Sequence, residues 1–380
     1  MDETETESPT GPLETGISVI KGYLKTLPQA PGVYRMLSAK GDVLYVGKAK
    51  NLPKRVTSYT QPARLPLRLQ RMVSETRSME FVTTHTEAEA LLLECNIIKK
   101  LMPRYNVLLR DDKAFPYIAI SKHAYPQLFK YRGHRNLADA TYYGPFASGG
   151  AVSETLDSLY RIFQLRNCSD NFFANRSRPC LQYHIKRCTA PCTQKVSAQQ
   201  YAAQVRQAKD FLTGKSSDIQ AELAAEMQAF AEARDYEKAA AIRDRIRALT
   251  TIQQRQDINA TGVEDADVIA AAQMAGHTCV QVFFFRQGRN YGNRSYFPSH
   301  EKGLGVPEVM EAFLGQFYAG KQIPPLILLS EEPAEKDILH EALELNAGSA
   351  IEMLVPQRGE KRRLMDHALS NAKQAIERRM

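Results

Sequence analysis

The 380-residue sequence has no tryptophan and no uninterrupted apolar stretch of the roughly 18 residues that a membrane-spanning helix needs. No segment is therefore expected to cross a membrane. The start, MDETETESPTGPLETG, holds five acidic residues and no basic one. A secretory signal begins with basic residues and continues with an apolar stretch, so this segment is not one. We interpret residues 1–19 as a disordered acidic tail and expect a cytoplasmic protein.

Cysteine is also scarce, and its distribution is uneven. Cys95 and Cys279 stand alone, and the other four of the six lie close together in the sequence: Cys168, Cys180, Cys188 and Cys192. In a cytoplasmic chain, such a cluster indicates a metal site rather than disulfides. The spacing is not the paired CxxC of a zinc ribbon, and four thiolates bind either zinc or an iron–sulfur cluster. The spacing alone leaves both open.

The composition is that of a globular protein, with 43% hydrophobic and 24% charged residues. A chain of this length is too long for one compact core, so we expect two to four modules. The net charge is +8, and residues 21–110 contain many more basic than acidic side chains. A basic module of this kind suits a nucleic-acid backbone, although a merely soluble basic surface would look the same.

The first module combines a strand hairpin with two helices. Residues 33–37 and 43–46 are β-rich runs around a polar loop, Asn51 is a candidate N-cap, and a longer helix is expected from Thr86. Glu94 lies on that helix, and its neighbours three and four positions away are all apolar. A carboxylate on an apolar face is costly unless it pairs with a cation or binds a metal, so both interpretations stay open.

Three segments of this module carry a family resemblance. They read PGVY at 31–34, YVGKAKNLPKRVTSY at 45–59 and EAEALLLECNIIKKLMPRYNVLLRDD at 87–112. Together they resemble a GIY-YIG nuclease domain of the UvrC family, the DNA-incising subunits of bacterial excision repair. Valine replaces isoleucine in the first triplet, which preserves a buried β-branched position.

The resemblance implies roles for particular residues in DNA hydrolysis. Glu94 would hold one Mg²⁺ or Mn²⁺ ion, Tyr45 would accept the proton of the attacking water, and Arg55 would bind the scissile phosphate. A phenol needs nearby positive charge for this task, and Lys48 and the metal are the candidates for supplying it. The remaining site residues would orient water and phosphate or hold the site together: Tyr34, Gly47, Tyr59 and Asn106.

Two later segments resemble other parts of the same family. The cysteine-rich segment resembles the region of the UvrC family that carries a [4Fe–4S] cluster, which favours that cluster over zinc. Two helical runs around Arg234–Tyr236 predict a helical hairpin, which resembles the motif through which the family binds UvrB. The matching residues expected to contact the partner are Met227, Tyr236, Glu237, Ala240, Arg243, Asp244 and Ile246.

These inferences predict an α+β multidomain chain with an incomplete C-terminal domain similar to RNase H. The expected parts are the tail (1–19), a GIY-YIG nuclease domain (20–112), a linker with the cysteine cluster (113–197), the hairpin (198–255) and the RNase H-like half-domain (256–380). The expected function is incision of damaged double-stranded DNA 3′ of a lesion after recruitment by UvrB, with UvrA acting indirectly. The alternatives are a standalone nuclease of the Cho or homing type and a catalytically silent binding fragment.

Overall fold

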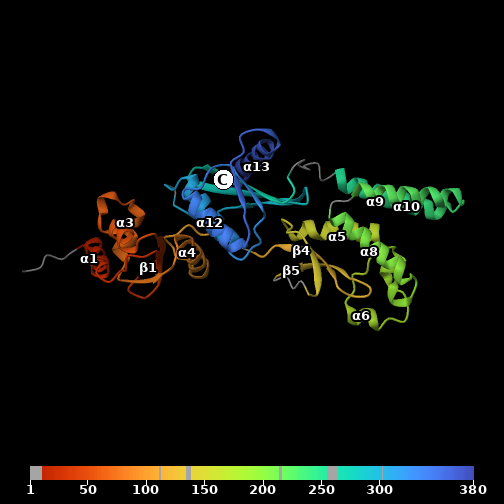
Figure 1. The fold of residues 1–380 in the computed structure, drawn as a ribbon, viewed down its shortest axis with the longest axis horizontal. Helices are drawn as coiled ribbons and strands as arrows, with labels where there is room; N and C mark the ends of the chain where they lie inside the picture. Colours follow the sequence, from red (N-terminus) through yellow and green to blue (C-terminus); the bar gives the residue numbers. More distant parts are fainter. Residues whose placement is uncertain (1–10, 111–112, 134–137, 214–215, 255–262, 302) are drawn as a thin grey trace, which may run out of the picture.

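The computed structural model describes residues 11–110, 113–133, 138–213, 216–254, 263–301 and 303–380. The molecule is elongated, and its units do not follow one another in space in chain order. The C-terminal unit lies in the middle, between the N-terminal unit on one side and the central region with its helical hairpin on the other (Figure 1). Among these residues, no helix is long and apolar enough to cross a membrane.

The N-terminal unit is a three-stranded antiparallel sheet, ordered β2-β1-β3, with helices packed around it. The strands are β1 (Gly32–Leu37), β2 (Val43–Ala49) and β3 (Ser78–Thr83). The helices are α1 (Pro12–Leu24), α2 (Leu52–Thr57), α3 (Leu67–Glu75) and α4 (Glu87–Leu101), and two 3-10 turns follow α2 at Ser58–Thr60 and Pro62–Arg64.

Local capping explains where two of these helices begin. The Asn51 side chain accepts a hydrogen bond from the Lys54 amide at 3.0 Å, and the Thr86 side chain accepts one from the Glu89 amide at 3.1 Å. Both caps were expected from the sequence. The tail prediction is wrong for residues 12–19, which form the first turns of α1 and bury Gly16 against α3. Residues 1–10 lie outside the described residues.

The central region is a second small antiparallel sheet, ordered β5-β4-β6, followed by helices. Its strands are β4 (Pro116–Ser121), β5 (Leu128–Arg132) and β6 (Ala140–Tyr143). Its helices are α5 (Gly149–Phe163), α6 (Asp170–Ala174), α7 (Leu181–His184) and α8 (Ala198–Leu212), with a 3-10 turn at Pro191–Thr193. The segment expected to be a linker therefore contains a folded sheet.

The helical hairpin consists of α9 (Ser216–Glu232) and α10 (Tyr236–Gln254), which pack along each other. Asp235 caps α10 by accepting a hydrogen bond from the Lys238 amide at 3.3 Å. Helix α8, which we had assigned to the hairpin, packs on α5 and shares the central core through Tyr201, Val205 and Phe211. It is therefore structurally part of the central region.

The C-terminal unit is a five-stranded mixed sheet, ordered β11-β10-β7-β8-β9, covered by three helices. Its strands are β7 (Ala266–Met274), β8 (His277–Arg286), β9 (Arg289–Tyr296), β10 (Leu326–Leu329) and β11 (Glu352–Leu354). Its helices are α11 (Val306–Tyr318), α12 (Lys336–Ala347) and α13 (Gly359–Glu377). Strands β7, β8 and β9 pair antiparallel, whereas β10 pairs in parallel with β7 and β11.

The C-terminal unit packs tightly on the N-terminal unit. Helix α4 lies against α11 and α12, and Leu108 forms an isolated β-bridge with Ser299. A Cβ atom at Gly315 of α11 would come within 2.5 Å of the Cys95 sulfur, so only glycine permits this approach. The isolated Cys95 is thus a buried packing residue.

Candidate nuclease site

Three tyrosines pack together in the N-terminal unit, and one of them, Tyr45, lines a pocket. Tyr34 of β1, Tyr45 of β2 and Tyr59 of the 3-10 turn after α2 have ring centroids 5.9 to 6.3 Å apart. The Tyr34 and Tyr59 hydroxyls are hydrogen bonded at 2.7 Å, and both side chains are buried. Burial raises the pKa of all three phenols, so they are protonated hydrogen-bonding groups in this state.

Arg55 brings the positive charge to this cluster. Its guanidinium carbon lies 5.8 Å from the centre of the Tyr59 ring, and its interactions with Tyr34 and Tyr59 raise the pKa of Arg55. Because Arg55 also lines the main pocket of the molecule, its planar group can reach an anion there.

Glu94 of α4 faces the same pocket. The Lys48 amide donates a hydrogen bond to its Oε1 atom at 3.0 Å, and no described residue pairs with its other oxygen. Desolvation raises the pKa of Glu94 to about 7, against the opposing charge of Lys48. A half-buried carboxylate with one unused oxygen is the donor that a hard divalent cation needs, and such an ion keeps several waters as its other ligands. The donor set therefore fits Mg²⁺ or Mn²⁺.

Gly47 and Asn106 hold this arrangement together. Gly47 pairs with Tyr34 across the hairpin, and a Cβ atom there would lie 2.3 Å from the Tyr34 hydroxyl. The missing side chain at Gly47 therefore leaves room for the Tyr34 ring. The buried Asn106 side chain accepts from the Val46 amide at 2.9 Å and donates to the Val46 carbonyl at 2.7 Å, which fixes β2 beside Tyr45.

Lys48 was expected to supply positive charge beside Tyr45. Burial, Tyr59 and Glu94 raise the pKa of Tyr45, and Arg55 lowers it. The Lys48 ammonium group instead pairs with Glu335 and lies 3.8 Å from Glu311. Lys48 therefore lines the site, but its ammonium group interacts with carboxylates of the C-terminal unit.

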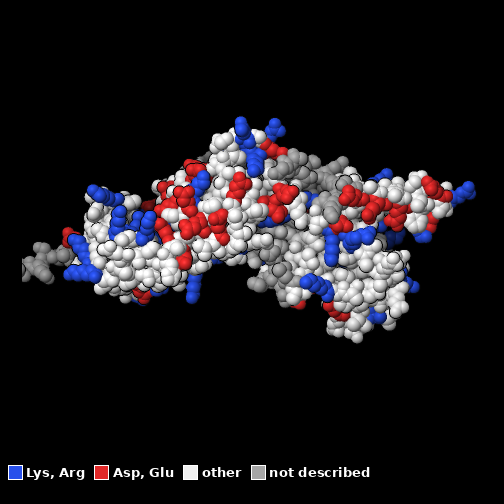
Figure 2. All heavy atoms as spheres, viewed as in Figure 1, with Lys and Arg blue, Asp and Glu red and all other residues white. Residues whose placement is uncertain are grey.

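The pocket has two walls of opposite charge. Its volume is about 1050 Å³, and it lies between the N-terminal unit and the start of α11 and α12. Lys48, Arg55 and Arg68 line one wall, and four carboxylates line the other: Glu301, Glu308, Glu311 and Glu335. Figure 2 shows acidic side chains gathered over α12, beside the more basic N-terminal unit. We call Glu301, Glu308, Glu311 and Glu335 the acidic wall. They were not predicted as part of the site, because they are remote in sequence from the N-terminal unit.

Comparison with known sequences matches four parts of the chain. The UvrC-like GIY-YIG domain matches residues 30–107, the UvrC/Cho excinuclease middle domain 115–211, the UvrB/uvrC motif 217–251 and the UvrC ribonuclease H-like domain 265–379. The chain is also 57% identical to UvrABC system protein C of Paramagnetospirillum magneticum over 99% of its own length.

The chain belongs to the UvrC family. UvrABC system protein C of Rhodospirillum rubrum, 57% identical over 96% of this chain, supports the same assignment. The chain spans 60% of the first relative's length and 57% of the second. The solved GIY-YIG domain of UvrC from Thermotoga maritima, described as bound to its catalytic divalent cation magnesium, is 38% identical. That match covers 23% of this chain and 96% of the domain, with a TM-score of 0.22.

The four clustered cysteines of this UvrC family member line one hollow in the central region. Cys188 is buried, and Cys168, Cys180 and Cys192 are half-buried. Nowhere in the described part of the chain, however, do three or more Cys, His, Asp or Glu side chains form a group that could hold a metal ion. The sequence thus located the cluster, but the structure does not support the expected [4Fe–4S] or zinc ligation.

The predicted partner-binding residues of the hairpin do not share one surface. Tyr236, Glu237, Arg243 and Asp244 are exposed, with Tyr236 67% exposed. Met227 and Ile246 are half-buried and pack against the central core, and Ala240 is half-buried. Arg245 ties the hairpin to α5 by donating to the Ile162 carbonyl at 2.6 Å. Only the exposed subset can meet a partner without rearrangement.

Proposed function

We propose that the N-terminal unit hydrolyses a phosphodiester bond of damaged double-stranded DNA, 3′ of the lesion. The meeting of Tyr45, Arg55 and Glu94 at one pocket, with Tyr34 and Tyr59 packed against Tyr45, carries the proposal, together with membership of the UvrC family. Hydrolysis of this bond requires an oriented water, neutralisation of charge on the phosphoryl group and a group that takes up the water's proton.

Each residue has a role that its contacts support. Glu94 would hold the divalent cation, Mg²⁺ or Mn²⁺, which when bound supplies positive charge to the phosphoryl oxygens. Arg55 binds the scissile phosphate through its planar fork. Tyr45 orients the attacking water and takes its proton when positive charge near Glu94 offsets the effect of burial on its pKa. Tyr34 and Tyr59 fix the position of Tyr45, and Asn106 fixes strand β2.

Recruitment is the second part of the proposal. The exposed residues of the hairpin offer an aromatic ring, Tyr236, beside the charged residues Arg243 and Asp244. Such a mixed surface suits a specific protein partner, and membership of the family points to UvrB, with UvrA loading it. In the described arrangement the acidic wall lines the same pocket as Arg55, so its negative charge opposes the approach of a DNA backbone.

A nicking assay tests this function. The chain is incubated with UvrA, UvrB, ATP and Mg²⁺ on a 5′- and 3′-labelled duplex that carries one bulky lesion, beside a Glu94→Ala variant. One nick 3′ of the lesion that is lost in the variant is the expected result. Nicking without UvrB would favour a standalone nuclease, and retained UvrB binding without a nick would leave only a docking fragment.

We also propose that the four clustered cysteines take up a metal centre, a [4Fe–4S] cluster with zinc as the alternative. The support is that all four thiols line the same hollow, although they would have to close on the metal. Metal analysis of anaerobically purified protein, with visible absorbance at about 400 nm for a cluster, tests it. Protein free of iron and zinc at normal stability would refute it.

A further inference from the structure

One stretch of the central region is strongly basic. Residues 171–209 contain no aspartate or glutamate, and their seven basic residues are Arg176, Arg178, Lys186, Arg187, Lys195, Arg206 and Lys209. No acidic side chain in the described part of the chain pairs with Arg176, Arg178 or Lys186. A surface of this kind attracts polyanions.

The same stretch exposes apolar side chains. Twelve large hydrophobic residues are exposed among those described, and four of them lie within residues 172–185. The four are Phe172 (46% exposed), Leu181 (68%), Tyr183 (36%) and Ile185 (46%). Two are aromatic, and a dense group of exposed apolar residues in a basic segment indicates a binding surface.

Two of the exposed apolar residues and one basic residue lie at the same hollow, which has a volume of about 530 Å³. These residues are Phe172, Leu181 and Arg176, and they line the hollow together with the four cysteines. The Arg176 guanidinium carbon lies 4.4 Å from the centre of the Phe172 ring. The Arg176 Nε atom is buried and has no hydrogen-bond partner among the described residues, so its hydrogen-bonding capacity remains available to a ligand.

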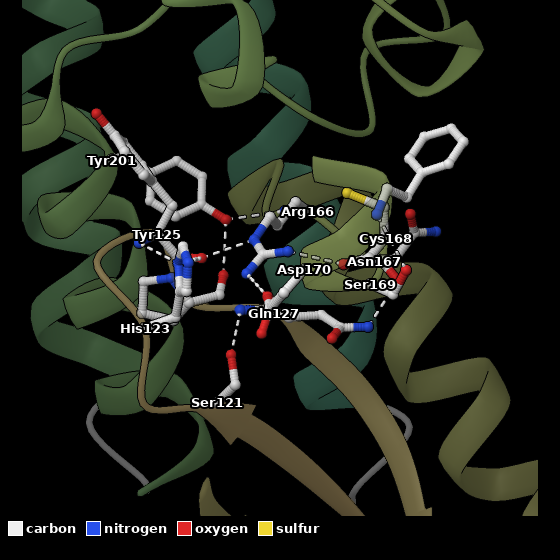
Figure 3. A network of polar contacts seen from close by, with 12 residues as sticks. Ser121, His123, Tyr125, Gln127, Arg166, Asn167, Cys168, Ser169, Asp170 and Tyr201 are labelled. Carbon is white, nitrogen blue, oxygen red and sulfur yellow. Dashed lines mark hydrogen bonds and ion pairs between the residues drawn. The ribbon is translucent and has the colours of Figure 1, made fainter. Parts of the chain in front are cut away.

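A rigid support holds this surface in place (Figure 3). Arg166 is 1% exposed, donates to the Tyr125 carbonyl at 2.6 Å and to the Cys168 carbonyl at 2.8 Å, and pairs with Asp170. The Tyr201 hydroxyl of α8 accepts from the Arg166 amide at 3.0 Å. The segment that carries Phe172 is thus anchored to the sheet and to α8, so little ordering is needed when a ligand binds.

We propose that this surface, formed by Phe172, Arg176 and Leu181 at its rim, binds unpaired nucleotides of a DNA strand. An unpaired base can stack on the Phe172 ring and Arg176, while the basic side chains contact the backbone phosphates. A duplex keeps its base faces covered and cannot use the aromatic ring in this way. The surface adds a strand-binding site to the proposed nuclease, and it can be tested without cleavage.

The first test measures binding of fluorescent oligothymidine of about 16 nucleotides, and of a duplex of equal length, by anisotropy. The full chain carries Glu94→Ala and no divalent cation is added, so the result does not depend on nuclease activity. Phe172→Leu should weaken oligothymidine binding about tenfold, because it keeps an apolar side chain but removes the stacking face. Phe172→Trp should retain binding, and duplex affinity should change less than twofold.

Matched controls separate stacking from general effects. Leu345→Ala changes an exposed apolar residue on α12 and should leave binding intact. Arg176→Gln should weaken oligothymidine binding and lower its salt dependence by about one charge, whereas Arg363→Gln on α13 should do neither. Melting temperatures confirm that all variants fold. Unchanged binding in Phe172→Leu, or an equal loss for oligothymidine and duplex, would overturn the proposal.

Discussion

Glu94 of the N-terminal unit and Asp267 of the C-terminal unit are both removed from solvent at least in part, but they differ in their hydrogen-bond partners. Asp267 of β7 is 1% exposed, and both its oxygens are occupied: Arg286 donates to one at 2.8 Å and the Tyr318 hydroxyl to the other at 2.8 Å. Glu94 of α4 has one oxygen held by the Lys48 amide and the other facing a pocket. Asp267 therefore stabilises the fold, whereas Glu94 can bind a ligand.

The comparison shows that burial alone does not mark a functional acid. A buried carboxylate needs partners, and the protein supplies all of them at Asp267 but only some at Glu94. The Glu94 oxygen that faces the pocket can therefore bind a cation.

Glu94→Gln should lower DNA cleavage about 1000-fold, equivalent to about 4 kcal/mol, because the neutral amide cannot hold a divalent cation. The expected change in melting temperature is small, since the amide still accepts from Lys48. Single-turnover nicking at saturating Mg²⁺ measures the effect. If cleavage survived, Glu94 would not be the metal ligand.

Asp267→Asn should lower the stability of the fold and leave DNA cleavage nearly unchanged, which is the opposite of the effect expected for Glu94→Gln. Removing the charge leaves Arg286 buried without its ionic partner, at a cost of about 3 kcal/mol in the free energy of unfolding. Cleavage by the folded variant should stay near the parent level. Urea unfolding and nicking at low temperature check both parts, with the exposed Asp337→Asn as control. A selective loss of cleavage at unchanged stability would assign Asp267 a catalytic role.

Gly47→Ala should reduce cleavage about 100-fold, because the added methyl group displaces the Tyr34 hydroxyl and disturbs the three tyrosines. Gly22→Ala is the matched control, since a Cβ atom there contacts nothing within 4 Å. Nicking rates compared at equal folded fraction measure the effect. Equal rates in the two variants would mean that the tyrosine cluster tolerates the displacement.

Glu311→Gln with Glu335→Gln should strengthen duplex binding about threefold at low salt, because two acids of the acidic wall lose their charge next to Lys48. The gain should vanish at high salt. Anisotropy at several ionic strengths measures it, with Glu332→Gln, which pairs with Lys336, as control. An equal gain in the control would reflect net charge alone.

Local sequence signals predicted much of the nuclease unit. The β1–β2 hairpin, the caps at Asn51 and Thr86 and the pocket-facing side of α4 all follow from residues near one another in the chain. They were predictable because capping and periodicity act over a few residues. The family resemblance added Arg55 and the tyrosines, and the structure brings them together.

The failures share a physical cause as well. The ion pair of Lys48 with Glu335 and the burial of Asp267 between Arg286 and Tyr318 join residues remote in sequence. The first turns of α1 were missed because their acidic composition looked disordered, although Gly16 lets the helix pack on α3. Helix α8 was assigned to the wrong unit because amphipathic periodicity does not say which core a helix joins.

The sequence by itself determined the residues of the chemistry and the local elements that carry them, since these depend on short-range backbone preferences and side-chain type. Only the tertiary structure decided which charges are free and which are paired. It placed the acidic wall opposite Arg55, satisfied Asp267 and left one oxygen of Glu94 open. Long-range packing sets these partners, because electrostatic and hydrogen-bonding energies depend on distance in space and on burial rather than on separation along the chain.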